Sequence, residues 1–313
     1  MGPAFLRGCE LVECARYAEA LEEFEQSEDT WETRWNRAQT LLALGRYQEG
    51  FAENAIRLRM FPRLLISTGH AIRDVVPTWR GESLSGKHIV LIHEQGLGDA
   101  VLMLRYVDIL KKMGCFVSLE MPKELRRFCS SIAPPFSGGA NYCCPMFDLP
   151  LWLGTTPQSV PCSNLRADPA LIEEWSKFFT GSKELVGIAW VAKNHDPERT
   201  IAIDKFLACT GLGDGVDLVS LQTNEREKAL ARRVIVPKIR DVADVAAIAC
   251  LMSRIVSIDT LALNVVGAVN HPNVIGLIPY HTNWKWLCGN PWYPNIRLLR
   301  QSRPGDWSDL CEF

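Results

Sequence analysis

The sequence has almost no net charge and no long apolar segment. Its 34 Lys and Arg against 36 Asp and Glu leave a formal charge of −2 at pH 7, which gives no general attraction to nucleic acid or to an anionic membrane. Charged residues interrupt every hydrophobic stretch before it reaches membrane-spanning length. The stretch 1–14 is too short and too mixed in composition for a secretory signal. We therefore expect a cytoplasmic protein without a transmembrane segment.

The usual sequence patterns of metal sites are also missing. The eleven cysteines include no Cys-x-x-Cys pair, so a zinc cage is not expected. No Asp-x-Asp motif ends a predicted strand. We expect the cysteines to be reduced thiols that pack as small hydrophobic side chains, and we expect no bound metal and no cofactor.

Helical periodicity fills the first part of a chain whose 313 residues are enough for two core-bearing domains and an appendage. Residues 46–50 echo residues 16–20 at an offset of thirty, and Gly45 suits the turn between two helices. Tetratricopeptide (TPR) repeats are about 34 residues long. The pattern predicts a short TPR-like α-helical segment over residues 1–75. We expect it to pack on the next domain, because so few repeats do not form a free-standing solenoid.

From residue 87 onward the pattern becomes that of an α/β protein. An apolar run at 88–92 is followed by a glycine turn, a helical stretch at 100–113 and a second strand at 115–120. A doubly wound domain begins in this way. A loop-rich stretch, roughly 133–165, ends the first lobe. A second series then has predicted strands at 185–190, 216–221, 254–258 and 274–278 and amphipathic stretches at 224–233, 241–252 and 261–269.

The two series predict two Rossmann-like domains that face each other across a cleft, because ligands bind where the carboxyl ends of such strands meet. We place the first domain at 76–180 and the second at 181–313, and we expect the C-terminal tail of the second domain to return to the first lobe.

The first candidate motif is the turn that follows the strand at 88–92. Gly96 and Gly98 allow a tight turn and close backbone approach, and Asp99 stands near a helix N-terminus that faces the cleft. Asp99 is either a functional carboxylate or a cap for the helix amides. The glycine pair alone is a weak signal, because the third glycine of a dinucleotide fingerprint is missing.

The second candidate motif is the strand end at Asp259 and Thr260, directly before a predicted helix. Free amides and a hydroxyl at the positive end of a helix suit a diphosphate, although an N-cap is again the alternative. A third motif, residues 190–200, follows the first strand of the second lobe. Its Lys193 and Arg199 can neutralise a departing phosphate, or the segment is a solvated loop.

Aromatic residues gather near the end of the chain. Such side chains stack on sugar and base faces, but clusters of this kind are more often core, and we expect core packing for most of them. They are Trp284, Trp286, Trp292 and Tyr293.

Taken together, these motifs resemble a known family. In chain order the matching segments are Pro77-Thr78-Trp79-Arg80-Gly81-Glu82, Glu94-Gln95-Gly96-Leu97-Gly98-Asp99, Arg105-Tyr106, Trp190, Arg199-Thr200, Ser220-Leu221-Gln222, Asp259-Thr260, Pro291-Trp292-Tyr293-Pro294, Leu298, Arg300-Gln301 and Asp306-Trp307. The chain is similar to bacterial TPR-containing glycosyltransferases whose C-terminal part resembles lipopolysaccharide heptosyltransferases (glycosyltransferase family 9). Such proteins are often described as O-GlcNAc-transferase-like. The resemblance covers nearly the whole chain.

The resemblance implies a GT-B fold and a hexosyl- or heptosyl-type transferase. It implies an inverting, metal-independent enzyme that moves a sugar from a nucleotide-diphosphate sugar to an acceptor hydroxyl, with Asp99 as the general base. By the same resemblance the donor contacts are Gly96, Gly98, Trp190, Lys193, Arg199, Gln222, Asp259, Thr260, Leu261 and Asn264, and the acceptor contacts are Glu94, Gln95 and Arg105. The sugar and the nucleotide stay open, and so does the acceptor: a glycan, a lipid-linked glycan, a protein or a modified nucleic acid.

The chain departs from the family pattern at Asn264, where members usually carry a histidine. An amide donates a hydrogen bond to phosphate but cannot become cationic. The departure keeps a second hypothesis open: a catalytically inactive GT-B scaffold or binding protein that holds a protein partner through its TPR-like helices. Joint retention of Asp99, Arg199, Asp259 and Thr260 favours the enzyme.

Overall fold

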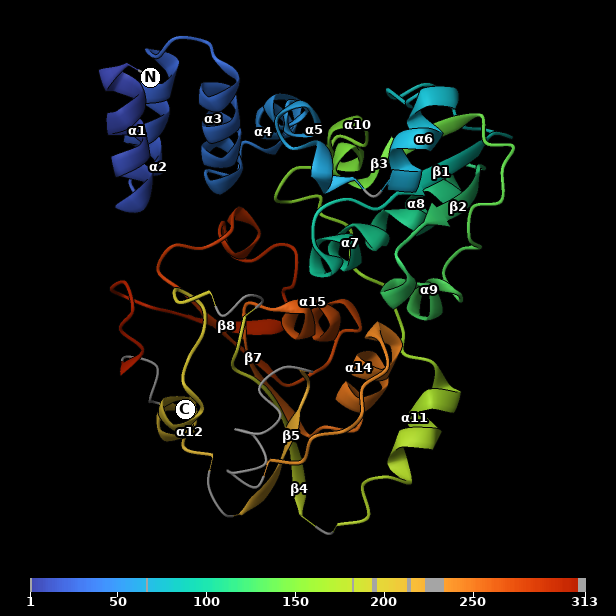
Figure 1. Ribbon diagram of the computed structural model, residues 1–313, viewed down its shortest axis with the longest axis vertical. Helices are drawn as coiled ribbons and strands as arrows, with labels where there is room; N and C mark the ends of the chain where they lie inside the picture. The colour runs from blue at the N-terminus through green and yellow to red at the C-terminus, as the bar shows by residue number, and fades with distance from the viewer. Residues whose placement is uncertain are drawn as a thin grey trace.

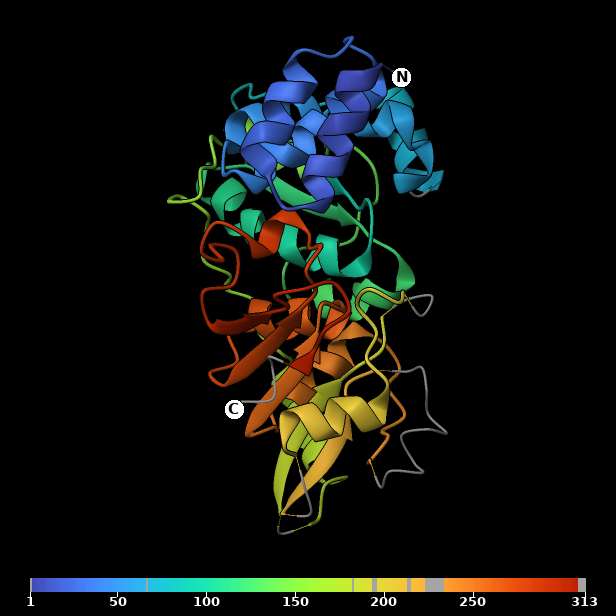
Figure 2. The same ribbon diagram turned by 90° about the vertical axis from the view of Figure 1, so that its left-hand side faces the viewer.

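Two α/β lobes and a group of N-terminal helices are stacked along the long axis of the molecule. The computed structural model describes residues 2–65, 67–181, 183–192, 196–212, 215–222 and 234–308. Figure 1 shows the N-terminal helices beside the first lobe at one end of the molecule and the second lobe at the other end. Figure 2 shows the same order from the side. No helix among the described residues combines the length and the apolar character needed to cross a membrane.

The N-terminal segment begins with two helix pairs. The elements are α1 (Pro3–Glu13), α2 (Tyr17–Glu25), α3 (Trp31–Ala43), α4 (Tyr47–Asn54), α5 (Arg57–Met60), η1 (Pro62–Leu64) and α6 (Ser67–Val75). Gly8 of α1 packs against Phe24 of α2, where an added Cβ would lie 2.6 Å from the ring. Gly50 of α4 packs against Leu42 of α3, where it would lie 2.7 Å from Cγ. A glycine therefore lets the two helices of each pair approach closely.

The first lobe is built on a parallel sheet with the strand order β2-β1-β3. Its elements are β1 (His88–Ile92), α7 (Leu97–Met103), η2 (Leu104–Tyr106), α8 (Val107–Lys112), β2 (Phe116–Glu120), α9 (Lys123–Cys129), β3 (Tyr142–Pro145), η3 (Met146–Asp148) and α10 (Leu149–Trp152). The central strand β1 is buried from Ile89 onward, as expected of a parallel strand covered on both faces. The predicted strand, turn and helix are all present.

The second lobe has a larger parallel sheet with the order β5-β4-β6-β7-β8. Its elements are α11 (Pro169–Ser176), β4 (Glu184–Ala189), α12 (Ile203–Thr210), β5 (Val216–Ser220), α14 (Val242–Ala249), β6 (Arg254–Ile258), α15 (Leu261–Ala268), β7 (Val274–Ile278), η5 (Trp284–Trp286) and β8 (Ile296–Arg300). Neighbours on β6 face opposite sides: Ile255 packs in the core that contains α14 and α15, and Val256 packs in the core that contains α12. The amphipathic stretch predicted at 224–233 lies outside the described residues.

The lobes meet at two helix pairs, α7 with α15 and α9 with α14 (Figure 1). At the first, an added Cβ on Gly98 would lie 2.9 Å from Nδ2 of Asn264. At the second, a guanidinium nitrogen of Arg127 lies 2.7 Å from Asp241 and 2.7 Å from Asp244. The cleft expected between the lobes is closed at these two points.

A segment between β7 and β8, residues 279–295, leaves the second lobe and packs on the N-terminal helices; we call it the crossing segment. Trp284 contacts Tyr47 and Phe51 at ring-centroid distances of 6.0 and 5.5 Å. The indole N–H of Trp292 donates a 3.0 Å hydrogen bond to the Tyr47 hydroxyl. The contact with the first part of the chain therefore comes from an internal segment, and β8 then rejoins the second sheet. The core packing predicted for the aromatic cluster is confirmed, because Trp284, Trp286, Trp292 and Tyr293 are all buried.

None of the ten cysteines among the described residues forms a disulfide. Five of them are buried, namely Cys115, Cys129, Cys143, Cys144 and Cys209. Half of these cysteines are therefore buried, as expected of small hydrophobic side chains.

Candidate functional site

Asp99 stands in the first turn of α7, and each of its carboxylate oxygens accepts one hydrogen bond. Oδ2 accepts the backbone N–H of Gly96 at 3.2 Å, which is a capping interaction. Oδ1 lies 3.2 Å from Nζ of Lys285. The side chain is 25% exposed, so it can reach solvent or a ligand. Both interpretations of this motif therefore remain: Asp99 caps its own turn, and it lies at the junction of the lobes.

Lys285 is the functional candidate that the sequence analysis missed. It lies in η5 of the crossing segment and is buried, with its ammonium 5.5 Å from the ring centre of Trp286. Burial lowers the pKa of Lys285, but the charges of Asp99 and Asp259 and the hydrogen bond to Asp99 outweigh burial and raise that pKa. A charged lysine is thus held between the lobes. The available signal was a lysine flanked by two tryptophans, because a cation in such an apolar run needs an anionic partner.

Asp259 and Thr260 lead from β6 into α15. Asp259 is buried, with Nη1 of Arg199 at 3.9 Å from its Oδ2 and 3.4 Å from its carbonyl oxygen. Arg199 also pairs with Asp196 at 2.8 Å. The Thr260 hydroxyl lies 3.2 Å from that of Ser257 and does not cap α15. The positive end of α15 and a guanidinium therefore lie together.

Trp190 and Gln222 shape the end of β4. Trp190 is almost fully buried, and the side-chain oxygen of Gln222 accepts the backbone N–H groups of Trp190 and Val191 at 2.8 and 3.1 Å. The two residues support the loop that carries Arg199. Lys193, predicted as a donor contact, lies outside the described residues.

Asn264 lies between the lobes, and both polar ends of its side chain have partners. Its amide nitrogen donates to the carbonyl oxygen of Thr260 at 2.8 Å, and its oxygen accepts from the Tyr293 hydroxyl at 3.4 Å. The side chain is buried against Gly98. This geometry gives Asn264 a packing role at the junction of the lobes. Leu261 is half-buried at the start of the same helix.

Two of the three predicted acceptor contacts, Glu94 and Arg105, are enclosed. Glu94 is wholly buried. Its carboxylate accepts hydrogen bonds from Nε and Nη2 of Arg57, each at 2.7 Å, and a third from the backbone N–H of Phe147 at 2.7 Å. The pair of Arg57 and Glu94 therefore links the N-terminal helices to the first lobe. Gln95 is half-buried, has a φ of 64°, and its backbone N–H donates to the carbonyl oxygen of Leu64 at 2.9 Å.

The Arg105 guanidinium lies 5.2 Å from the ring centre of Trp292 and 5.0 Å from that of Tyr293. Burial lowers the pKa of Arg105. These rings separate Arg105 from solvent, so the structure places it in the core between the first lobe and the crossing segment.

His93, the residue directly after β1, is buried close enough to Asp99 for the two charges to interact. Burial lowers the pKa of His93, and the charges of Asp99 and Glu124 and a backbone hydrogen bond at Gly96 only partly oppose this. A neutral imidazole therefore lies beside the candidate carboxylate, in a role that the sequence analysis did not assign.

The charged groups at the junction alternate in sign, in the order Asp196, Arg199, Asp259, Lys285 and Asp99. Carboxylates from both lobes are thus joined by cations. Within the described part of the chain, no group of three or more His, Cys, Asp or Glu residues is arranged to hold a metal ion.

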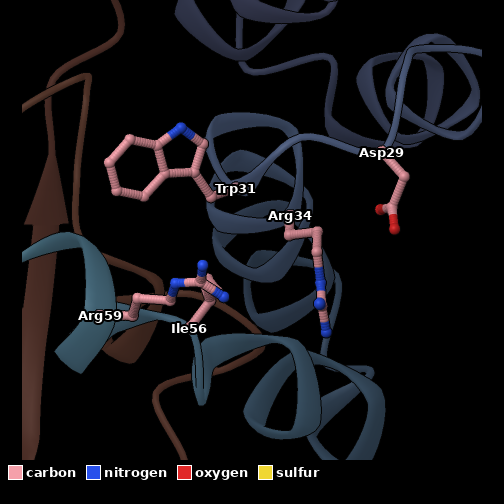
Figure 3. A pocket seen from close by; sticks show the side chains of 5 residues that line it. All are labelled: Asp29, Trp31, Arg34, Ile56 and Arg59. Carbon is pink, nitrogen blue, oxygen red and sulfur yellow. The ribbon is translucent and has the colours of Figure 1, made fainter.

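Separate hollows lie on the N-terminal half. Figure 3 shows one of about 370 Å³, in which Arg59 and Ile56 face the indole of Trp31, with Arg34 and Asp29 on the remaining walls. Trp31 is 48% exposed. A second hollow, of about 540 Å³, shares Arg59 and is also lined by Arg73, Arg80 and Trp152. These surfaces are rich in arginine and indole, the side chains most often found at binding hot spots.

Comparison with solved structures defines the class of fold. The chain is similar to the crystal structure of the glycosyl transferase family 9 protein from Veillonella parvula, with a TM-score of 0.51 and 12% identity. The match covers 71% of this chain and 88% of that one. With its parallel sheets and α/β lobes, the molecule therefore has a GT-B-like fold, as predicted. At this identity the likeness concerns the fold alone.

Comparison with curated proteins finds a relative that is longer than this chain. The chain is 27% identical over 327 residues to Protein FlbA of Caulobacter vibrioides, a match that covers 90% of this chain and 54% of FlbA. The chain thus spans about half the length of this relative. No protein-family profile matches the chain.

Proposed function

We propose that this protein is an inverting, metal-independent glycosyltransferase that moves a sugar from a nucleotide-diphosphate sugar to an acceptor hydroxyl. The observation that carries the proposal is the meeting of two elements at the lobe junction. Asp99, a partly exposed carboxylate of the first lobe, faces the start of α15 in the second lobe, where Arg199 and Asp259 lie. The GT-B-like fold supports the same interpretation.

In the proposed reaction Asp99 accepts the proton of the acceptor hydroxyl. The oxygen forms a bond to the anomeric carbon from the face opposite the nucleotide, and the bond from that carbon to the diphosphate oxygen breaks. A positioned base contributes about 10²–10⁴-fold to such a step. The leaving diphosphate takes up the bonding electrons and is stabilised by the first amides of α15 and by Arg199. Charges fixed by the fold would take the place of a metal ion.

Asp99→Asn tests this assignment. We expect turnover of a nucleotide sugar, measured as hydrolysis or transfer in the presence of EDTA, to fall by about 10²–10⁴-fold because the base is lost. Asp108→Asn, in α8 of the same lobe, is the matched control and should keep wild-type turnover. Near-wild-type turnover of Asp99→Asn would contradict the base assignment. Activity that is lost in EDTA and restored by magnesium or manganese would contradict metal independence.

A second candidate function is that of a binding protein built on an inactive GT-B body. Two observations favour it: Asn264 packs inside the junction, and the arginine- and indole-lined hollows around Arg59 lie on the helical half. In that case the N-terminal helices hold a protein partner. A wild-type protein that neither hydrolyses nor binds any member of a panel of nucleotide sugars and nucleoside diphosphates would favour this function over the enzyme.

A further inference from the structure

Lys285 is the cation that the two candidate aspartates share. Its ammonium nitrogen lies 3.2 Å from Oδ1 of Asp99, and the charge of Asp259 also acts on it. Asp99 belongs to the first lobe, Asp259 to the second lobe and Lys285 to the crossing segment. One buried cation therefore connects the candidate base with the candidate donor position.

The cations at the junction are already paired with carboxylates before a ligand arrives. Among the described residues in the alternating series, the carboxylates are Asp99, Asp196 and Asp259 and the cations are Arg199 and Lys285. Three negative charges against two positive ones leave a net charge of −1. Each cation already contacts a carboxylate. Adding a diphosphate to a site that is negative and largely buried is unfavourable unless a cation turns toward the new anion.

Of the two cations, Lys285 is the one whose movement would change Asp99. Arg199 is held by Asp196 of its own loop. The Lys285 ammonium instead donates a hydrogen bond to Oδ1 of Asp99, and the backbone N–H of Gly96 donates one to Oδ2. An acceptor hydroxyl must therefore compete with Lys285 for the base.

We propose that Lys285 changes partners when a nucleoside diphosphate reaches the start of α15, and so releases Asp99 only after the donor has bound. In the free protein Lys285 holds Asp99. In the donor complex its ammonium pairs with the diphosphate, and Oδ1 of Asp99 becomes available to the acceptor hydroxyl. Lys285 is thus a positioning residue that couples donor binding to the base. The inference rests on the proposed function, and it predicts that the donor binds before the acceptor.

The competing explanation is that Lys285 only joins the lobes. The two explanations differ in what Asp99→Asn does to diphosphate affinity. If Lys285 is shared between Asp99 and the diphosphate, removing the Asp99 charge makes the lysine more available and tightens binding. If Lys285 is only a structural link, removing its partner weakens the junction and brings no gain in affinity.

The test is calorimetric titration of pyrophosphate and of the uridine, guanosine, adenosine, cytidine and thymidine diphosphates in EDTA. We expect Asp99→Asn to bind the preferred diphosphate about three- to tenfold more tightly than wild type. We expect Lys285→Met to bind it at least about tenfold more weakly, because a charged hydrogen bond is lost, and Lys285→Arg to retain most of the affinity. In the Lys285→Met background, Asp99→Asn should bring no gain.

The exposed pair Lys177 and Glu173, 2.9 Å apart at the C-terminal end of α11, offers matched controls. Lys177→Met and Glu173→Gln should leave affinity unchanged. If wild type binds a diphosphate and Asp99→Asn binds it equally or more weakly, the inference is overturned. A gain from Asp99→Asn that persists in the Lys285→Met background overturns it too. Should Lys285→Met fail to fold, Lys285→Gln takes its place as the background in which Asp99→Asn should bring no gain. Absence of binding in wild type and Asp99→Asn alike contradicts the proposed function itself, and this inference with it.

Discussion

Arg57 is a wholly buried guanidinium that ties the N-terminal helices to the first lobe. It pairs with Glu94 and with Asp148, at 2.7 and 2.8 Å. Burial lowers the pKa of Arg57, but the two carboxylates outweigh burial and raise it. The charge persists inside the protein because both partners are present. Removing one member of such a group leaves the others without compensation.

Arg57→Met is therefore expected to lower the free energy of unfolding by about 3–5 kcal/mol, because Glu94 is left charged and buried. Urea unfolding followed by circular dichroism measures this. The surface pair Arg16 and Glu19 is the control, and Arg16→Met should change stability little, because both side chains lie in solvent. Equal losses from the two substitutions would show that the buried pair has no special role.

At the scale of secondary-structure elements, the contact between α7 and α15 depends on a glycine. An added Cβ at Gly98 would lie 2.9 Å from Nδ2 and 3.1 Å from Cγ of Asn264. Asn264 cannot move away easily, since Thr260 and Tyr293 hold its two polar ends. The close approach of these helices brings Asp99 within reach of Lys285.

Gly98→Ala is expected to lower the free energy of unfolding by about 1–3 kcal/mol through overpacking, and to weaken diphosphate binding as the helices separate. Thermal unfolding and titration measure the two effects. In the Gly98→Ala/Asn264→Ala double variant the obstructing amide is gone, and part of the stability should return. Gly215→Ala is the control, since an added Cβ there meets nothing within 4 Å. If Gly98→Ala matches this control, the contact is looser than described.

Some elements could be predicted from the sequence and others could not, for physical reasons. Strands β1 and β6 are short, mainly apolar segments that are buried from their second residue onward, so their bounds were predicted from local pattern alone. Strand β8 reads Ile-Arg-Leu-Leu-Arg and lies at the edge of its sheet, where arginines reach solvent, so no apolar run identified it.

The same limit applies to the candidate site. Asp99, Asp259 and Arg199 lie at strand and helix ends, where position in a βα unit points to function. Lys285 was missed because its partner Asp99 is 186 residues away in the chain, and no local spacing relates them. Glu94 was predicted as an acceptor contact from the family resemblance. Its partner Arg57 lies in α5 of the preceding helical segment, and no local spacing in the sequence relates the two.

At the scale of the whole molecule, Asp244 joins the lobes through a cluster of charged groups. It lies 2.7 Å from Arg240 and 2.7 Å from Arg127, and it accepts the Trp175 indole N–H at 3.0 Å. Burial raises the pKa of Asp244, but the hydrogen bonds from Arg240 and Trp175 and the charge of Arg127 outweigh burial and bring it well below its ordinary value of 3.8. The ionised form is therefore favoured by folding.

Because the folded pKa is depressed, the stabilisation by Asp244 is complete above its ordinary value of 3.8 and is lost as the pH falls below it. We expect wild type to lose stability between about pH 5 and pH 3 more steeply than Asp244→Asn, which has no carboxyl to protonate. Urea midpoints at several pH values measure the slopes. Parallel slopes would mean that the cluster does not control the acid response.

The crossing segment has a consequence for how this chain can be divided. Trp284 and Trp292 rest on Tyr47 and Phe51, so the N-terminal helices form one wall of the core around Lys285. A variant that lacked the helices up to α6 would expose these indoles to water and would be expected to aggregate. The helices are therefore not a detachable module. Any grafting, truncation or evolutionary shuffling that keeps the transferase-like body must also keep the helices, or else replace Trp284 and Trp292 with polar residues.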